Sequence, residues 1–440
     1  MAIVANDPAT QRSLAVLRGL FRERLGRDVA VRFWDGTSIP APSAVFELIV
    51  ATPFALRAAF TPPLDLNPGR AVVEGWLGVA GDVEAALDTL ERSVGRLSKL
   101  ALARLVTQLA RLPAPPKLDA GGAQLIGKRH SKARDAAAIG FHYDQPVAFY
   151  RTFLGSDLVY SCGYWDEDVT TLDGAQRAKL DYVLDKVRLR AGATFLDIGC
   201  GWGSLVIRAA QRGARALGIT LSRRQYDEAQ RRIEAAGVGD RARVELRDYR
   251  DLGERTFDAI ASVGMVEHVG RERLQEYFDV AYRALRPGGL FLNHGITSQS
   301  RDGKGWRAGG DFIGRYVFPD GDLVSLDTTL RSAERAGFEV RDVENLREHY
   351  ARTLRAWVAN LRGARDAVID LTDERTERIW HLYMAGSARN FGLGRMGLAQ
   401  TLLAKPRADG TVDIPPTRRD LYRDGAPRAS APALPSASAT

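Results

Sequence analysis

The sequence predicts an α/β protein in which helices cover both faces of a parallel β-sheet, with a small α+β domain before it. Apolar, strand-like runs alternate with helical spacing between residues 173 and 297, a pattern typical of parallel sheets. A glycine-rich turn at 199–203 joins the first of these strands to a helix, as in nucleotide-binding sheets. The chain has 440 residues, which exceeds one ordinary core and predicts a further domain.

The N-terminal residues 1–112 are predicted to form the α+β domain. Helical spacing and short extended runs broken by Gly and Pro occur in turn at 10–26, 29–83, 83–95 and 97–111. Proline and glycine are then frequent, and they predict a linker over 113–138. This linker contains the basic run Lys128–Arg134, which is either a solvated hinge or a phosphate-binding patch.

Residues 139–405 are predicted to form the domain that contains the parallel sheet. Helices are expected near 350–366 and 373–389, after a glycine-rich loop at 298–320. Residues 406–440 are rich in Ala, Pro and Ser, so we predict a disordered tail. The expected strands of the sheet are FLDIG (195–199), ARALGIT (214–220), RVELRDY (243–249), FDAIASVG (257–264) and GLFLNHGIT (289–297).

The glycine turn itself, FLDIGCGWG at 195–203, predicts a nucleotide-like ligand. Glycines allow positive φ and close approach of a ligand, and the following helix start offers unpaired N–H groups. The spacing of Gly199, Gly201 and Gly203 is one residue short of the dinucleotide fingerprint. A P-loop is excluded because no Gly-Lys-Ser/Thr follows, whereas a tight turn without any ligand stays open.

Composition and charge limit the partners. The chain is 45% hydrophobic and 26% charged, with a net charge of +8, so a soluble protein with an acidic partner is expected: nucleic acid, an anionic membrane surface or an acidic substrate. Its two cysteines, Cys162 and Cys200, provide neither a disulfide framework nor a four-ligand zinc site. The N-terminus does not read as a signal peptide, and charges and proline interrupt the apolar stretch 44–60. We therefore expect a cytoplasmic protein whose membrane contact is peripheral.

Several short motifs occur in an order that one enzyme family shares. They are HYD (142–144), YSCGYW (160–165), LDIGCGWGSL (196–205), GITLSRRQ (218–225), RDYRDL (247–252), SVGMVEHVG (262–270), LNHGIT (292–297) and FPDG (318–321). Together they resemble the cyclopropane-fatty-acyl-phospholipid synthases, which are class I S-adenosylmethionine-dependent methyltransferases, over roughly residues 140–400. The likeness of the N-terminal domain is weaker, and it implies a role in lipid binding.

The resemblance implies that S-adenosylmethionine is the cofactor and that its site can be carried over position by position. The methionine end matches Tyr160 and Ser161, and the ribose matches the stretch 220–225. Ser222 and Gln225 also form S-x-x-Q, a capping box for the next helix. The remaining matched positions, in the glycine turn, near the ribose and around the adenine, are Phe195, Leu196, Asp197, Ile198, Gly199, Cys200, Gly201, Trp202, Gly203, Thr220, Leu221, Asp248, Tyr249, Arg250 and Val263.

The reaction that the resemblance implies also needs a base. Methyl transfer from a sulfonium to an alkene creates a carbocation, and a cyclopropane ring closes only when the new methyl group loses a proton. The family is understood to use bound bicarbonate, and no metal is required. The matched positions are Cys162, Glu267, His294, the backbone of Ile296, and Tyr350, whose groups donate to or accept from an oxyanion. His268, beside Glu267, is treated as structural because adjacent residues rarely face one site.

The sequence leaves several alternatives open. Gln145 and Pro146 follow the HYD motif where the family has a small residue, Asn and Asp, so the product could instead be a methylated or methylenated acyl chain. A nucleic-acid methyltransferase is disfavoured because Ser262–Glu267 does not resemble a site for a flipped base. A non-catalytic lipid-binding protein is the third reading. The partners expected are unsaturated phospholipid and the anionic inner face of the membrane; a homodimer is left open.

Overall fold

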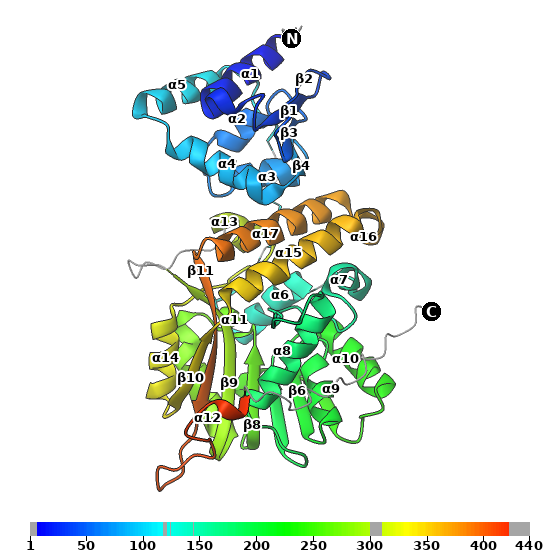
Figure 1. Cartoon of the computed structure of the whole chain (residues 1–440), viewed down its shortest axis with the longest axis vertical. Helices are drawn as coiled ribbons and strands as arrows, with labels where there is room; N and C mark the ends of the chain where they lie inside the picture. Colours follow the sequence, from blue (N-terminus) through cyan, green and yellow to red (C-terminus); the bar gives the residue numbers. More distant parts are fainter. Residues whose placement is uncertain (1–6, 118–120, 124, 144, 300–309, 422–440) are drawn as a thin grey trace. The chain divides into compact units, whose positions relative to one another are not determined.

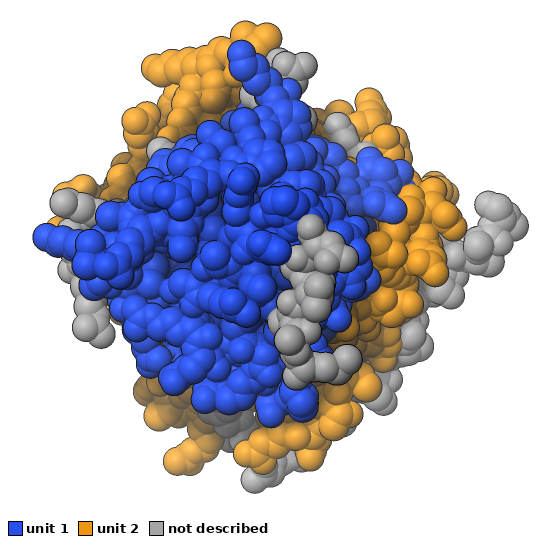
Figure 2. All heavy atoms as spheres, turned by 90° about the horizontal axis from the view of Figure 1, so that it is seen from above, with its two compact units in different colours: residues 1–122, 309–317, 372–389 blue, residues 123–308, 318–371, 390–440 orange. Residues whose placement is uncertain are grey.

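The computed structural model describes residues 7–117, 121–123, 125–143, 145–299 and 310–421, and these form two compact units (Figures 1 and 2). The first unit comprises residues 1–122, 309–317 and 372–389, and the second comprises 123–308, 318–371 and 390–440. The sequence analysis assigned 309–317 and 372–389 to the catalytic domain, whereas their contacts are with the N-terminal residues. In the part of the chain that the structure describes, no helix is long and apolar enough to cross a membrane.

The first unit is built around a four-stranded sheet of order β2-β1-β3-β4. Its helices are amphipathic, and their apolar sides form one core with the sheet, from Leu14 on the first helix to Leu109 on the fifth. Phe312 and Arg378 of the two later segments contact this unit at Gly69 and at the Val73 carbonyl. The elements are α1 (Pro8–Phe21), η1 (Arg22–Arg24), β1 (Ala30–Phe33), β2 (Ser38–Ile39), β3 (Phe46–Val50), α2 (Ala55–Phe60), α3 (Asn67–Val73), β4 (Leu77–Gly81), α4 (Val83–Gly95), α5 (Lys99–Ala110), α13 (Gly310–Tyr316) and α17 (Glu374–Gly392), the last of which ends in the second unit.

The second unit contains a seven-stranded sheet of order β10-β11-β9-β8-β5-β6-β7. The five predicted strands are confirmed, and all of them run parallel. Two further strands, which the sequence analysis did not predict, add an antiparallel edge. The strands are β5 (Thr194–Ile198), β6 (Arg215–Thr220), β7 (Ala242–Leu246), β8 (Phe257–Val263), β9 (Leu285–Ser298), β10 (Glu339–Asn345) and β11 (Met396–Ala404).

Helices cover both faces of this sheet, as predicted, because neighbouring strand residues point to opposite sides. Phe195 belongs to a core with α8, α9 and α10, whereas Leu196 belongs to a core with α11, α12 and α14. The remaining elements of the unit are α6 (Lys132–Tyr143), α7 (Val147–Leu154), α8 (Leu172–Lys186), α9 (Ser204–Gln211), α10 (Arg223–Ala235), η2 (Tyr249–Asp251), α11 (Val266–Val269), η3 (Arg271–Arg273), α12 (Leu274–Ala284), α14 (Leu326–Arg335), α15 (Arg347–Gly363), α16 (Arg365–Leu371) and η4 (Arg419–Leu421).

Three expectations about connecting segments need correction. Within the predicted linker, α6 begins at Lys132, and two members of the basic run pair with carboxylates: Arg134 with Asp320 and Lys132 with Asp251, each at 2.5 Å. Within the predicted loop 298–320, residues 310–316 form α13, while 300–309 lie outside the described residues. Within the predicted tail, Val412 and Ile414 pack against the core. Residues 422–440, like Asp144 of the HYD motif, lie outside the described residues.

A candidate cofactor and active site

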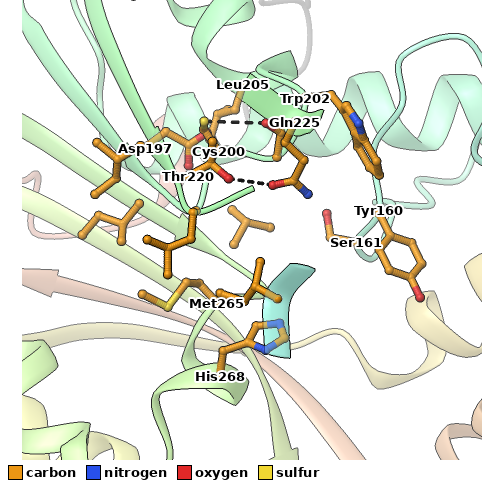
Figure 3. A pocket seen from close by; sticks show the side chains of 18 of the residues that line it. Tyr160, Ser161, Asp197, Cys200, Trp202, Leu205, Thr220, Gln225, Met265 and His268 are labelled. Carbon is orange, nitrogen blue, oxygen red and sulfur yellow. Dashed lines mark hydrogen bonds between the residues drawn. The ribbon is translucent and has the colours of Figure 1, made fainter. Parts of the chain in front are cut away.

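A cavity, here called the strand-end cavity, lies at the carboxyl ends of β5, β6 and β8 (Figure 3). β6 and β8 flank β5 on opposite sides, and ligands bind in the crevice that such a reversal of strand order opens. Figure 3 shows side chains from the turn after β5, from β6 and from the segment after β8 facing this space. The predicted cofactor residues that line it are Tyr160, Ser161, Asp197, Ile198, Gly199, Cys200, Gly201, Trp202, Thr220, Leu221, Gln225, Asp248, Tyr249, Arg250 and Val263.

The other predicted cofactor residues have structural positions. Phe195 and Leu196 are fully buried in the two cores of the sheet. Gly203 precedes α9 with a φ of 82°, and Ser222 caps α10 by accepting a 3.2 Å hydrogen bond from the Gln225 backbone. The Gln225 side chain does not complete a capping box, since its Oε1 accepts from Thr220 Oγ1 at 2.7 Å. Ser222 therefore orders the rim without facing the cavity.

The glycine turn leaves space at one position. A Cβ on Gly199 would lie 2.9 Å from Met265 Cγ, so this glycine is needed for packing. A Cβ on Gly201, where φ is +53°, would meet no atom within 4 Å. Because Gly201 lines the cavity, its missing side chain keeps room for a ligand rather than for the protein.

The rim near η2 is held by a buried arginine. Arg250 pairs with Asp248 at 2.6 Å and with Asp135 of α6 at 3.0 Å. Burial raises the pKa of Asp135, and Arg250 opposes that rise. The side chains of Asp135, Ile139 and Tyr143 bring α6 to the cavity. Sequence reasoning missed this helix as part of the site because it placed its start in the linker.

Sequence reasoning also missed Lys179, which lines the cavity from α8. Its side chain is buried and donates to Ser161 Oγ at 2.9 Å. Burial lowers the pKa of Lys179 to about 8 and raises that of Asp197 to about 7, and each charge partly offsets the shift of the other. A signal was present: Lys179 lies between the buried residues Ala175 and Val183 on the helix, a position where an unpaired lysine is costly.

His268 requires a correction. It was treated as structural, but it lines the strand-end cavity, whereas its neighbour Glu267 does not. Burial lowers the pKa of His268 to about 4, so its ring is neutral near pH 7. The argument that adjacent residues face different sites holds, yet the histidine is the one that faces this cavity.

None of the predicted base-holding residues lines the strand-end cavity, but a chain of contacts brings them together. Glu267 Oε1 accepts from the Ile296 backbone N–H at 2.7 Å. Ile296 lies opposite Leu398 in the sheet, and Leu398 O accepts from Leu346 N at 2.8 Å. Leu346 O in turn lies 3.8 Å from Cys162 Sγ. Five segments that are separate in the sequence are therefore linked by successive contacts.

His294 and Tyr350 complete this group. His294 lies two residues before Ile296 on β9 and contacts Gln400 Nε2 through Nδ1 at 3.1 Å. Tyr350, one turn into α15, packs its ring on Trp357 and Phe391. Gly264, which lines the cavity, donates its backbone N–H to the His294 carbonyl at 2.8 Å, and Cys162 directly follows the lining residue Ser161. His294 and Cys162 therefore lie in segments that border the cavity.

Two buried polar atoms of this group have no hydrogen-bond partner among the described residues: Glu267 Oε2 and His294 Nε2. Burial raises the pKa of Glu267 to about 7 and lowers that of His294 to about 3. Native proteins rarely leave such atoms unsatisfied, so water or a small polar ligand can pair with this acceptor and this ring nitrogen. In the described ranges no three His, Cys, Asp or Glu side chains are grouped to hold a metal ion.

Comparison with known proteins identifies the family. The family model described as mycolic acid cyclopropane synthetase matches residues 130–401. The chain belongs to this family. A probable fatty acid methyltransferase of Pseudomonas putida is 41% identical over 397 residues, covering 89% of this chain and 96% of the relative.

Solved structures of the family match part of this chain. A cyclopropane synthase from Mycobacterium tuberculosis is 32% identical with a TM-score of 0.59, covering 61% of this chain and 98% of its own. A mycolic acid cyclopropane synthase complexed with SAH and CTAB is 33% identical with a TM-score of 0.58, covering 61% and 97%. The predicted class I methyltransferase fold is thereby confirmed for this family member, and the family acts on fatty acyl chains with S-adenosylmethionine.

Proposed function

We propose that this protein transfers the sulfonium methyl carbon of S-adenosylmethionine to the cis double bond of unsaturated phospholipid acyl chains and closes a cyclopropane ring, with bicarbonate as the base. The observation that carries the proposal is a pair of buried atoms, Glu267 Oε2 and His294 Nε2, that find no partner in the described part of the chain, beside a cavity with an open glycine position. S-Adenosylmethionine supplies an electrophilic methyl group. Bicarbonate, when bound, accepts the proton that the new methyl group must lose.

The residues around the strand-end cavity fit the cofactor. Gly201 leaves room in the turn, and Asp197 Oδ1 is buried without a partner among the described residues, so it can accept from the amino group of the methionine end. Lys179 presents a cation to the carboxylate of that end. Thr220 and Gln225 bring polar atoms to the ribose, and Asp248 to the adenine side. These groups bind and orient, since fixed partners reduce the entropy that alignment costs.

The base-holding residues fit an oxyanion that carries one proton. His294 Nε2 and the Tyr350 hydroxyl are groups that can donate, whereas Glu267 Oε2 accepts from a protonated oxygen or from water. Burial keeps the pKa of His294 near 3, so the ring stays neutral and does not compete for the proton. The same burial raises the pKa of Glu267 to about 7. A carboxylate whose pKa lies near neutral pH can take up and release a proton at that pH, which suits Glu267 to proton transfer.

For the substrate, we propose phospholipid in the inner face of the membrane, with the first unit as its binding part. Helix α5 exposes Leu100, Leu102 and Val106 to 62%, 47% and 58%. Lys99 and Arg104 are exposed on the same helix, and the whole chain has a net charge of +8. Apolar side chains beside basic ones suit the surface of an anionic bilayer.

A second product has its own support. The relative from Pseudomonas putida is named a probable fatty acid methyltransferase, and Pro146 directly precedes α7 where the chain departs from the cyclopropane synthase pattern. If the cation loses a proton from the acyl chain instead of the new methyl group, a branched product forms. The two outcomes share every binding step, so only the product distinguishes them.

The test uses S-adenosylmethionine with a fully deuterated methyl group and vesicles of unsaturated phosphatidylglycerol. Loss of a deuteron from the new methyl group leaves two deuterium atoms in the product, whereas loss of a proton from the acyl chain leaves three. We expect two deuterium atoms in the product, and we expect fragmentation in the mass spectrometer to locate a ring. Depleting bicarbonate should slow turnover and its return should restore the rate. Three deuterium atoms support the branched product, and no transfer to any lipid contradicts both.

A further inference from the structure

Three side chains, buried at His294 and Gln400 and partly exposed at Glu344, form one row across the antiparallel edge of the large sheet. Glu344 on β10 lies opposite Gln400 on β11, and Gln400 lies opposite His294 on β9. Residues directly opposite on antiparallel strands point to the same face, so all three side chains share one side. Lys186, at the end of α8, lies over this row and donates to Gln400 Oε1 at 2.9 Å and to Glu344 Oε2.

The chemistry of Lys186 fixes the orientation of Gln400. An ammonium group has hydrogens to donate and no lone pair, so the amide oxygen must face Lys186 and the amide nitrogen must face His294. The ring atom it faces is Nδ1, at 3.1 Å. An NH₂ group cannot accept, so Nδ1 accepts the hydrogen bond. The ring hydrogen of the neutral imidazole is therefore on Nε2.

Lys186 is itself firmly placed. Its side chain is fully buried, with Glu344 in direct contact and Asp342 Oδ2 at 3.7 Å. Its Nζ lies 4.6 Å from the centre of the Tyr182 ring. Asp342 is shared with Arg418 at 2.6 Å. A buried cation without such partners is costly, so the Lys186 ammonium group is held at this position. Its position in turn fixes the orientation of Gln400.

The consequence appears at the far side of the imidazole. His294 Nε2 is buried without a partner among the described residues, and so is Glu267 Oε2. We infer that Lys186 and Gln400 are positioning residues, which hold His294 in the tautomer that presents a hydrogen-bond donor at Nε2 to the base anion. This inference rests on the proposed function, in which that anion is bicarbonate. In the other tautomer, with the ring hydrogen on Nδ1, Nε2 presents a lone pair to the same anion. The lone pairs of Nε2 and of the anion then repel each other.

The direct test is the tautomer of His294 in the full-length protein without substrate. In protein labelled with ¹⁵N in its histidines, Nε2 of His294 should show the shift and coupling of a protonated ring nitrogen and Nδ1 those of an unprotonated one, with signals assigned by loss in His294→Ala. A hydrogen on Nδ1 in the wild type overturns the inference. This measurement needs no second variant and does not depend on activity.

The variant Gln400→Glu reverses the constraint at almost constant size. Its carboxylate accepts from Lys186 and also from Nδ1–H, so the hydrogen of His294 should move to Nδ1. We expect kcat to fall roughly 10- to 100-fold, as for other second-layer partners of a functional histidine, while KM for unsaturated vesicles and Kd for S-adenosylmethionine stay within about threefold.

The matched control is Thr401→Val, the next residue on β11. Thr401 Oγ1 donates to the Asn293 carbonyl at 3.1 Å on the other face of the strand, so the control removes a buried hydrogen bond without touching the row. In Thr401→Val, the tautomer of His294 and the value of kcat should match those of the wild type. An inverted tautomer in Gln400→Glu with unchanged kcat overturns the positioning role. Independence of the wild-type rate from bicarbonate contradicts the proposed base instead, so the two failures are distinguishable.

Discussion

At the residue scale, the chemistry of this site depends on polar atoms that are buried without partners. Glu267, His294 and Asp197 each have one such atom in the described structure. Burial raises the pKa of both acids to about 7 and lowers that of the histidine to about 3. Each shift favours the neutral form, because a low-dielectric surrounding penalises charge. The same burial that costs stability prepares these groups to bind polar ligands.

The open position at Gly201 leads to the first prediction. Gly201→Ala should weaken S-adenosylmethionine binding about tenfold or more, because the added Cβ projects into the cavity. Gly192→Ala is the control: Gly192 also has a positive φ, +79°, and open space around its Cβ, but it lies outside the cavity lining. Both variants place a side chain at a positive φ, which costs roughly 1–2 kcal/mol. Calorimetry that shows equal loss of affinity in both, or none in Gly201→Ala, contradicts the assignment.

The raised pKa of Glu267 leads to a prediction about stability. Its folded pKa of about 7 exceeds the ordinary value of 4.5, so its contribution is fully present below pH 4.5 and is lost as the pH rises through 7. Glu267→Gln cannot ionise and avoids this loss. Relative to wild type, its free energy of unfolding should therefore rise by roughly 2–3 kcal/mol between pH 5 and pH 8.

Urea unfolding in bicarbonate-free buffer at both pH values measures this difference. Thr401→Val, which changes no ionisable group, should differ from wild type equally at both. A difference for Glu267→Gln that shrinks as the pH rises would show that the carboxylate is stabilised as an anion in the folded protein. In that case a cation lies close to the Glu267 carboxylate, and Glu267 does not act as a proton acceptor with a pKa near 7.

At the element scale, the parallel strands and the glycine turn could be predicted because each leaves a local pattern. β11 could not: all residues from Met396 to Ala404 are buried, so the segment lacks the apolar–polar alternation that distinguishes a strand from a buried helix. β10 has charged residues at several positions, and its partner is remote in the chain. For the same reason Gln400 and Lys186 escaped sequence reasoning, since only the register of the sheet brings them to His294.

The segment after Pro406 provides a prediction at this scale. Val412 and Ile414 pack on the core, Arg188 pairs with Asp420, and Arg418 pairs with Asp342. Ending the chain at residue 405 should lower Tm by roughly 2–6 °C, since the apolar contacts contribute about 1–3 kcal/mol. Ending it at residue 421 removes none of these contacts and should leave Tm unchanged. Equal Tm values for the two truncations would show that this packing contributes nothing to stability.

At the scale of the whole molecule, the sequence indicates two domains but not how the chain is shared between them. The solved relatives are covered almost completely, to 97% and 98%, by a match to 61% of this chain, so those solved chains are shorter than this one. Here, however, 309–317 and 372–389 belong to the first unit. These segments follow the sheet strands closely in the chain, and only contacts made after folding assign them to the first unit.

Removing residues 1–122 tests what the first unit contributes. Every residue that lines the strand-end cavity lies in the second unit, so the shortened protein should bind S-adenosylmethionine within about threefold of the full chain. It should be less soluble, because Phe312 loses its contact with Gly69 and Arg389 its ion pairs with Asp88 and Glu91. The variant Phe312→Ser in the shortened chain reduces the exposed apolar surface and should recover soluble protein.

Turnover then separates a lipid-binding first unit from a merely stabilising one. If α5 and its surroundings hold the bilayer, the shortened protein should lose at least about tenfold in rate on anionic phospholipid vesicles, because a peripheral enzyme depends on its surface affinity. On the same lipids dispersed in detergent, where no bilayer surface has to be found, its rate should approach that of the full chain. Equal losses on both substrates, with cofactor affinity intact, would assign the first unit to the catalytic step and remove the argument for membrane docking.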